Sequence, residues 1–255
     1  MAVKRVIRRS FADRVVERET KIAADPRGAA STARWAWEWT KSILVAFALF
    51  LIIRTFLVEA FRIPTGSMEN TLLIGDFLLV NKAVFGTRIP FTHVRLPGFD
   101  QPDRGDVIVF APPHDPARNY VKRLVARPGD TVEMRDKKVY LNGEPLAEPF
   151  VRHSDPGDTY STQMAWQCSH SVARGSSPCR PMRDNWGPVI VPEGRFLVLG
   201  DNRDDSEDSR YWGFVDRDAI AGRPLLIYYS FDAASTRPLP WLTRIRWGRI
   251  GETVH

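Results

Sequence analysis

An unbroken run of eleven apolar residues near the N-terminus constrains this chain of 255 residues more than any other feature. The run extends from Ile43 to Ile53, and three tryptophans lie just upstream between residues 35 and 39. Eleven residues alone are too few to cross a bilayer, which needs about 20, but the apolar flank Phe56-Leu57-Val58 lengthens the segment. Tryptophans are typical of the membrane interface. The pattern predicts a single transmembrane helix over residues 37–58, and a buried core helix is the alternative.

The charge before this segment predicts its orientation. Residues 1–34 contain nine Lys or Arg and four Asp or Glu, and the whole chain has a formal net charge of +6. An excess of basic residues marks the cytoplasmic side of a membrane helix. We therefore expect residues 1–36 to be a basic cytoplasmic segment and the body of the chain to lie on the outer side. A topology signal explains the charge, and no zinc-finger or RNP-type motif is present, so we expect no nucleic-acid partner.

The rest of the chain reads as short β-strands separated by turns. Gly (17 residues) and Pro (19 residues) are plentiful, which favours a turn-rich β protein. A hairpin is expected over residues 131–141, with its turn near Asp136-Lys137. Residues 151–190 are polar and irregular. Residues 241–250 contain both Trp and Arg, a composition that fits either a membrane-surface contact or a solvated final strand. Other expected strands are 77–80, 107–110, 120–126, 196–199 and 225–229.

A serine in a tight turn is the first chemical candidate. The sequence Ile63-Pro64-Thr65-Gly66-Ser67-Met68 places Ser67 in a turn where its backbone N–H can be free. Such a serine can act as a nucleophile and its own amide can stabilise an oxyanion. Most Gly-Ser turns have no such role, so the motif alone leaves both interpretations open.

A lysine inside an apolar strand is the second candidate. Period-2 alternation places Lys122 on the face of Tyr120 and Leu124, and Arg123 on the opposite face. Burial lowers the pKa of a lysine, and the neutral amine can act as a general base. An edge-strand lysine that deters aggregation is the alternative.

The third candidate is the charged run from Gly200 to Gly213. It is either a solvated loop or a hydrogen-bonded network in which Asp208 pairs with Arg210 and Ser206 faces the site.

Together these segments resemble bacterial type I signal peptidases, the Ser–Lys family that also includes self-cleaving repressors. The resemblance covers the chain from about residue 40 to the end, in the expected order and spacing. Its motifs are residues 63–68 with Gly75-Asp76, residues 104–110, residues 120–130 and residues 200–213.

The resemblance implies a role for each matching residue. Ser67 is expected to be the nucleophile and Lys122 the general base. Thr65, where serine is commoner, is expected to help hold the oxyanion, and Ser206 to orient the lysine. Asp208 and Arg210 fall on a supporting ion pair, and no metal or organic cofactor is expected.

The resemblance also implies a mainly β architecture and a place in the cell. The expected fold is an antiparallel-sheet catalytic domain, formed by residues 59–130 and 192–255, with an inserted second β domain at 131–191. The expected enzyme is a serine endopeptidase of the bacterial inner membrane. It has a single membrane span, a catalytic domain on the periplasmic or extracytoplasmic side, and secreted preproteins with small residues before the cleavage site as substrates.

Contact with the lipid bilayer is expected near the nucleophile, where apolar side chains can reach the outer leaflet. These are Phe61, Ile63, Leu72, Leu73 and Ile74. Cys168 and Cys179 are similar to a disulfide pair in some Gram-negative members, and two free thiols are the alternative. A conjugation-type protease, a self-cleaving relative and a non-catalytic leader-binding protein are competing functions. The membrane span disfavours the self-cleaving relative, and the intact Ser67 and Lys122 disfavour the leader-binding protein. The conjugation-type protease stays open.

Overall fold

The computed structural model describes residues 26–87, 89, 92, 94–172 and 179–255, with side chains from residue 34 onward. Most of the basic segment expected at residues 1–36 lies outside the described residues. The chain divides into two units, Met1–Ile52 and Ile53–His255.

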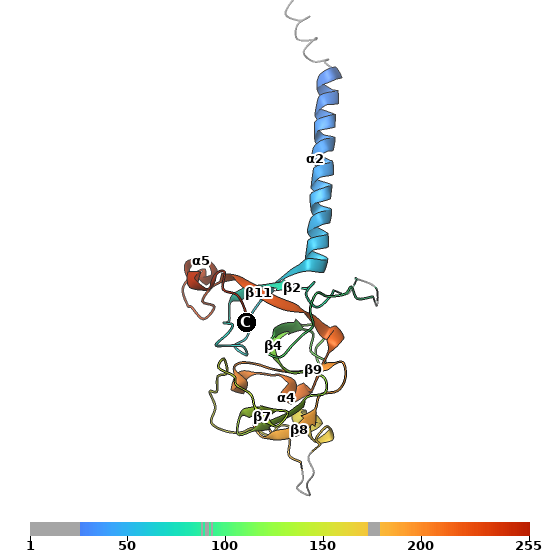
Figure 1. Cartoon of the computed structure of the whole chain (residues 1–255). Coiled ribbons are helices and arrows are strands. Elements are labelled where there is room, and N and C mark those ends of the chain that lie inside the picture. The colour runs from blue at the N-terminus through green and yellow to red at the C-terminus, as the bar shows by residue number, and fades with distance from the viewer. Residues whose placement is uncertain (1–25, 88, 90–91, 93, 173–178) are drawn as a thin grey trace, which may run out of the picture. The chain divides into compact units, whose positions relative to one another are not determined.

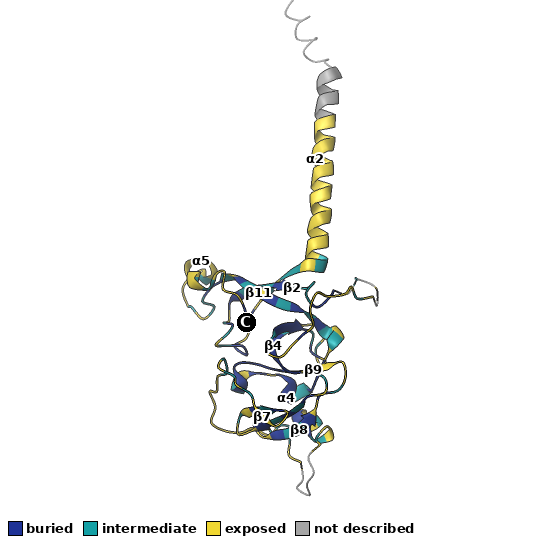
Figure 2. Cartoon of the chain, viewed as in Figure 1, coloured by how far each residue is buried: buried dark blue, intermediate teal, exposed yellow. Residues whose placement is uncertain are grey.

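The first unit contains one long helix, α2 (Pro26–Ile52), and a π-helical turn, η1 (Ile53–Leu57), follows it. The stretch Arg34–Leu57 has 24 residues and a mean hydropathy of 1.9. At 1.5 Å per residue it is about 36 Å long, which exceeds the hydrocarbon thickness of a bilayer. Its residues from 34 to 54 are exposed, as the yellow part of the helix in Figure 2 shows. Within the described residues this is the one helix long and apolar enough to cross a membrane.

A seven-stranded antiparallel sheet organises the second unit (Figure 1), in the order β1-β2-β11-β3-β4-β9-β10. The predicted mainly β, antiparallel fold that follows an N-terminal apolar helix is confirmed. The strands are β1 (Val58–Arg62), β2 (Asp76–Asn81), β3 (Val107–Phe110), β4 (Tyr120–Ala126), β9 (Arg195–Leu199), β10 (Val215–Asp216) and β11 (Ile220–Ser230).

Strand β4 is buried on both of its faces. Its register places Lys122 opposite Ile108 of β3, and Arg123 opposite Val107 of β3 and Leu199 of β9. Every residue from 121 to 126 is buried, because separate apolar clusters cover the two sides of the sheet. A strand buried on both faces does not alternate between polar and apolar residues, so both of its cations are held inside the protein.

A four-stranded sheet in the order β7-β6-β5-β8 lies at the end of the unit opposite to β2 and β11 (Figure 1). Its strands are β5 (Thr131–Arg135), β6 (Lys138–Leu141), β7 (Glu144–Pro145) and β8 (Trp186–Ile190). Val132 and Val189 of this sheet share one apolar cluster with Leu197 and Leu199 of the larger sheet. The two sheets therefore have a common core, and the division into an inserted domain at 131–191 stays a prediction.

Short helices connect these strands. The short helices are η2 (Thr162–Ala165), α3 (Trp166–Ser169), η3 (Arg203–Asp205), α4 (Ser209–Trp212), η4 (Arg217–Ala219), α5 (Pro240–Thr243) and η5 (Trp247–Arg249). Two of them, η2 and α3, lie within the segment 151–190 that was predicted to be polar and irregular. Two others, α5 and η5, occupy the stretch around residues 241–250, where a final strand was one of the two alternatives. Trp241 and Trp247 of that C-terminal part are exposed.

Candidate active site

The turn that carries Ser67 lies between β1 and β2 and is held from outside by Asn202. The Asn202 side-chain amide donates to the Gly66 carbonyl at 3.1 Å, and the Asn202 backbone N–H donates to the Ser67 carbonyl at 3.1 Å. Among the described residues, no acceptor is paired with the Ser67 N–H. The turn is therefore fixed while its amide stays available to a ligand.

Lys122 reaches this turn from the centre of β4. Its Nζ lies 2.5 Å from the Ser67 Oγ, and both residues are buried, with exposed fractions of 3% and 9%. Because β4 has neighbours on both edges, the position of the amine is set by a rigid element. A neutral amine at this distance can accept the proton of the hydroxyl.

A cavity of about 550 Å³ opens onto this pair. One wall is apolar, with Phe61, Ile63, Met68 and Val121, and suits small uncharged side chains. The remaining lining residues are mainly polar. They are Pro64, Thr65, Arg118, Asn119, Tyr120, Gln163, Asp204, Asp205, Ser206, Glu207 and Tyr211.

Burial sets the protonation of Lys122. Loss of water around the ammonium lowers the pKa of Lys122 from 10.5 to about 8, although the nearby Asp208 carboxylate acts in the opposite direction. With a pKa near 8, about one molecule in ten carries the neutral amine at pH 7. A carboxylate near the lysine is thus compatible with a lowered pKa.

The Asp208 charge is largely neutralised by Arg210. The Arg210 guanidinium donates to both Asp208 oxygens at 2.8 Å, and both side chains are fully buried. Burial opposes ionisation of Asp208, but the adjacent guanidinium and the N–H of Gly200 keep its pKa below the usual value. Both members of the ion pair are therefore charged, and the positive charge of Arg210 offsets the negative charge of Asp208.

Four of the six predicted site residues line the cavity, and the ion pair lies outside its lining. Ser67, Lys122, Thr65 and Ser206 are the lining members. Thr65 is exposed, whereas Ser206 is buried and its Oγ has no hydrogen-bond partner in the described part of the chain. The roles of these residues stay predictions. Among the described residues, no group of three or more His, Cys, Asp or Glu can hold a metal ion.

A second buried ion pair was not anticipated from the sequence. Arg123 donates to both carboxylate oxygens of Asp201 at 2.9 and 2.7 Å, and its guanidinium lies 3.7 Å from the ring centroid of Phe150. This pair connects β4 to the start of the loop that follows β9. Period-2 alternation along β4 did not predict this ion pair, because it places Arg123 on the face opposite Lys122, where an arginine is expected to be exposed to solvent.

Gly200 is a further residue whose role the sequence did not reveal. A Cβ at this position would overlap the Ser67 carbonyl oxygen and the Ser206 Oγ. Only glycine lets the end of β9 approach the nucleophile turn this closely.

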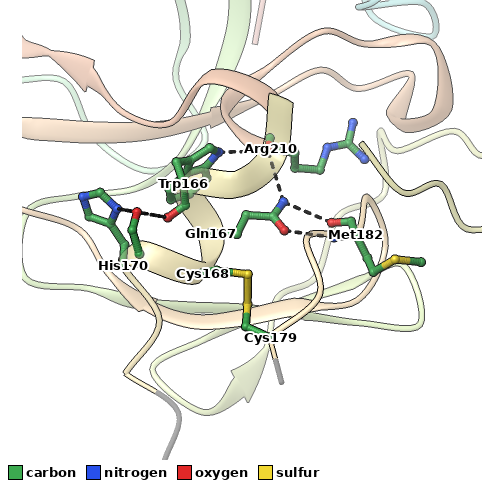
Figure 3. Close-up of a disulfide and its surroundings, with 8 residues drawn as sticks. Trp166, Gln167, Cys168, His170, Cys179, Met182 and Arg210 are labelled. Carbon is green, nitrogen blue, oxygen red and sulfur yellow. Dashed lines mark hydrogen bonds between the residues drawn. A yellow bond between two sulfur atoms is a disulfide. The ribbon is translucent and has the colours of Figure 1, made fainter. Parts of the chain in front are cut away.

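The structure joins Cys168 and Cys179 by a disulfide, next to residues that contact the α4 backbone (Figure 3). Trp166 and Gln167 of α3 both donate to the Arg210 carbonyl, at 2.9 and 3.1 Å. The cystine-bearing helix thus supports the backbone of the Asp208–Arg210 pair.

The expected lipid contact of Ile63 and Leu72 is wrong, because both residues are buried. Leu72 is fully buried and packs with Ile63 and Met68 in the apolar cluster of the larger sheet. Its neighbour Ile74 is 43% exposed. The apolar pattern around the nucleophile reflects core packing at this position.

Comparison with known proteins identifies the family. Residues 36–229 match the family described as "Signal peptidase, peptidase S26". A signal peptidase I of Pseudomonas aeruginosa is 38% identical over 224 residues, which cover 82% of this chain and 78% of that protein. A signal peptidase I of Aquifex aeolicus is 36% identical over 235 residues, which cover 78% of this chain and 87% of that protein.

A crystal structure of a signal peptidase I from Enterococcus faecalis is also similar, with a TM-score of 0.33 and 32% identity, over 48% of this chain and 96% of that chain. The family match and the curated relatives both extend over most of the sequence, and the resemblance inferred from the motifs is confirmed. This chain therefore belongs to the signal peptidases of the peptidase S26 family, which are serine peptidases.

Proposed function

We propose that this chain is a membrane-bound serine endopeptidase that removes signal peptides from exported preproteins with Ser67 as nucleophile and Lys122 as general base. The observation that carries the proposal is the 2.5 Å distance between the Ser67 Oγ and the buried Lys122 Nζ. Family membership supports signal-peptide cleavage, and the geometry supports the assignment of the two residues.

The dyad would work through an acyl-enzyme. The neutral Lys122 amine takes the hydroxyl proton as the Ser67 Oγ attacks the carbonyl carbon of the scissile bond. The resulting ammonium then protonates the leaving amine, and the C–N bond breaks. In the second half, the neutral amine takes a proton from water as the water oxygen attacks the carbonyl carbon of the ester. The bond from this carbon to the Ser67 Oγ then breaks, the Lys122 ammonium returns its proton to the Oγ, and the signal peptide leaves with a free carboxyl group.

Groups around the dyad would stabilise the charge that develops. The unpaired Ser67 N–H and the Thr65 hydroxyl are the candidate donors to the oxyanion. The unpartnered Ser206 Oγ can accept from the Lys122 ammonium and so orient it toward Ser67. The Asp208–Arg210 pair would hold the loop that carries Ser206.

Substrate choice would follow from the apolar wall of the cavity. Phe61, Ile63, Met68 and Val121 leave room for small side chains before the cleavage site, and a charged or large residue would lose its hydration or clash. The relatives carry the name signal peptidase I, which supports preproteins as the substrate class.

The apolar helix would anchor the enzyme in the bacterial plasma membrane. The stretch Arg34–Leu57 is long enough to span, and the basic residues before it favour a cytoplasmic N-terminus. Protease added to sealed right-side-out vesicles should then digest the catalytic body. Protection of the body in these vesicles would contradict the orientation.

The test uses the full chain in detergent and a preprotein with an Ala-x-Ala cleavage site. Wild type should release the mature protein after that site, and Ser67→Ala should lower kcat by at least about a thousandfold. The matched control is Ser154→Ala, which changes an exposed serine. If wild type cuts and Ser67→Ala cuts equally well, the nucleophile is wrong; if wild type does not cut, the function is wrong.

A further inference from the structure

The carboxylate of Asp204 joins the catalytic loop to the part of the chain that carries the smaller sheet. Asp204 lies between Asn202, which holds the nucleophile turn, and Ser206, which lines the cavity. One carboxylate oxygen accepts from the N–H groups of Ser154 and Asp155 at 2.7 and 2.8 Å. The side chain is fully buried, so its position is set by these partners and not by water.

The other carboxylate oxygen is bound by a lysine from the β5–β6 hairpin. Lys137 Nζ lies 2.9 Å from Asp204 Oδ1 and 2.6 Å from Asp184 Oδ2. Arg183 Nη2 is 3.3 Å from the same Asp204 oxygen. Lys137 is not among the residues that line the cavity, whereas Asp204 is, so Asp204 is its direct link to the site. A second link runs through Asp184, whose Oδ1 lies 3.9 Å from Arg210 Nη1.

The backbone of the hairpin turn gives an independent indication that this lysine has a role beyond the turn. Asp136 and Lys137 have φ angles of 46° and 68° and form the two-residue turn between β5 and β6. Glycine or asparagine is favoured in such a turn, because a left-handed backbone costs an ordinary residue about 1 kcal/mol. Glycine at position 137 would suit the turn better but could not reach Asp204.

We propose that Lys137 is a positioning residue of the peptidase reaction, which clamps the catalytic loop through Asp204. The clamp holds Ser206 and the nucleophile turn in their positions next to Ser67 and Lys122. This inference rests on the proposed function. The smaller sheet thereby contributes to catalysis without touching the reacting atoms. A misplacement of about 1 Å in such a site can cost up to about a hundredfold in rate.

The experiment compares Lys137→Met with Lys138→Met in the full detergent-solubilised chain on the same preprotein. Lys138 is the next residue, exposed on β6. Lys137→Met should lower kcat about tenfold and change KM less than about twofold, because substrate contacts stay intact. Lys137→Arg, which keeps the charge and the reach, should restore most of the rate. The fold should survive, since Asp204 keeps Arg183 and two N–H donors.

A double-mutant cycle with Asp204→Asn identifies the path of the effect. If Lys137 acts through Asp204, adding Lys137→Met to Asp204→Asn should lower kcat by less than about twofold. Independent, multiplicative losses would overturn the proposal. So would equal rates for Lys137→Met and Lys138→Met, or a rate loss that only matches the unfolded fraction. An inactive wild type would instead refute the proposed function.

Discussion

Replacing the buried Lys122 by methionine should make the protein more stable as well as inactive. The folded protein holds this amine in a dry site, where its pKa is lowered from 10.5 to about 8. The unfolded chain binds the same proton more tightly, so folding at neutral pH must either release a proton or bury a charge. Lys122→Met removes this cost while keeping the length of the apolar stem.

The size of the effect follows from the two pKa values. The free-energy cost of the lysine is about 3 kcal/mol at pH 7 and about 1 kcal/mol at pH 9.5. Because the pKa of the lysine is lowered in the folded state, the unfolded state binds more protons between about pH 8 and 10.5. The free energy of unfolding of wild type therefore rises with pH across that window, relative to that of the variant. The variant also loses the hydrogen bond to Ser67, worth about 1 kcal/mol at either pH. The change with pH, about 2 kcal/mol, is therefore the sharper quantity.

The assay is thermal unfolding of the full chain in detergent at pH 7 and pH 9.5, followed by tryptophan fluorescence. The Tm of Lys122→Met minus that of wild type should be larger at pH 7, by about 4 to 8 °C for a chain of this size. Lys138→Met, which changes an exposed lysine, should show no such pH dependence. A difference for Lys122→Met that does not change between the two pH values would refute the lowered pKa.

Three further predictions concern the same site. The kcat/KM of wild type should fall about tenfold per pH unit well below pH 8 and level off above it, because only the neutral Lys122 amine is the base; a flat profile between pH 6 and 9 would contradict this. Gly200→Ala should lower kcat about a hundredfold, since its Cβ would displace the Ser67 carbonyl; kinetics within twofold of wild type would disprove the close approach. Arg123→Met should lower the free energy of unfolding, measured in urea, by about 3 to 5 kcal/mol, because Asp201 stays buried without its cation; a loss under about 1 kcal/mol would show that the pair is not needed.

The strands of the fold follow from local pattern where the sequence has clear turns. Strands β3 (Val107–Phe110) and β4 (Tyr120–Ala126) have the bounds that the apolar runs and flanking turn residues predict. Strand β1 (Val58–Arg62) was not anticipated, because its first residue continues the apolar flank of the membrane helix. Strand β8 (Trp186–Ile190) contains Gly and Pro, which local propensity places in loops, and pairing with β5 overrides that preference.

The site was predicted through motif resemblance, since local pattern left Ser67 and Lys122 ambiguous. Period-2 alternation assumes that one face of each strand is exposed to solvent. Strand β4 has no such face, so alternation did not predict the burial of Arg123. The clamp formed by Lys137 and Asp204 joins residues 67 positions apart. Contacts of this kind depend on how the two sheets pack. They cannot be predicted from the local sequence pattern around either residue.

The central claim is that Lys122 is the base that activates Ser67. The most direct measurement is kcat/KM of Lys122→Met relative to wild type on a preprotein with an Ala-x-Ala site, at pH 8, with Lys138→Met as control. We expect a loss of at least about a thousandfold in a variant that stays folded, and full activity in the control. Cleavage by Lys122→Met at a rate close to wild type would contradict the account and assign proton transfer to another group.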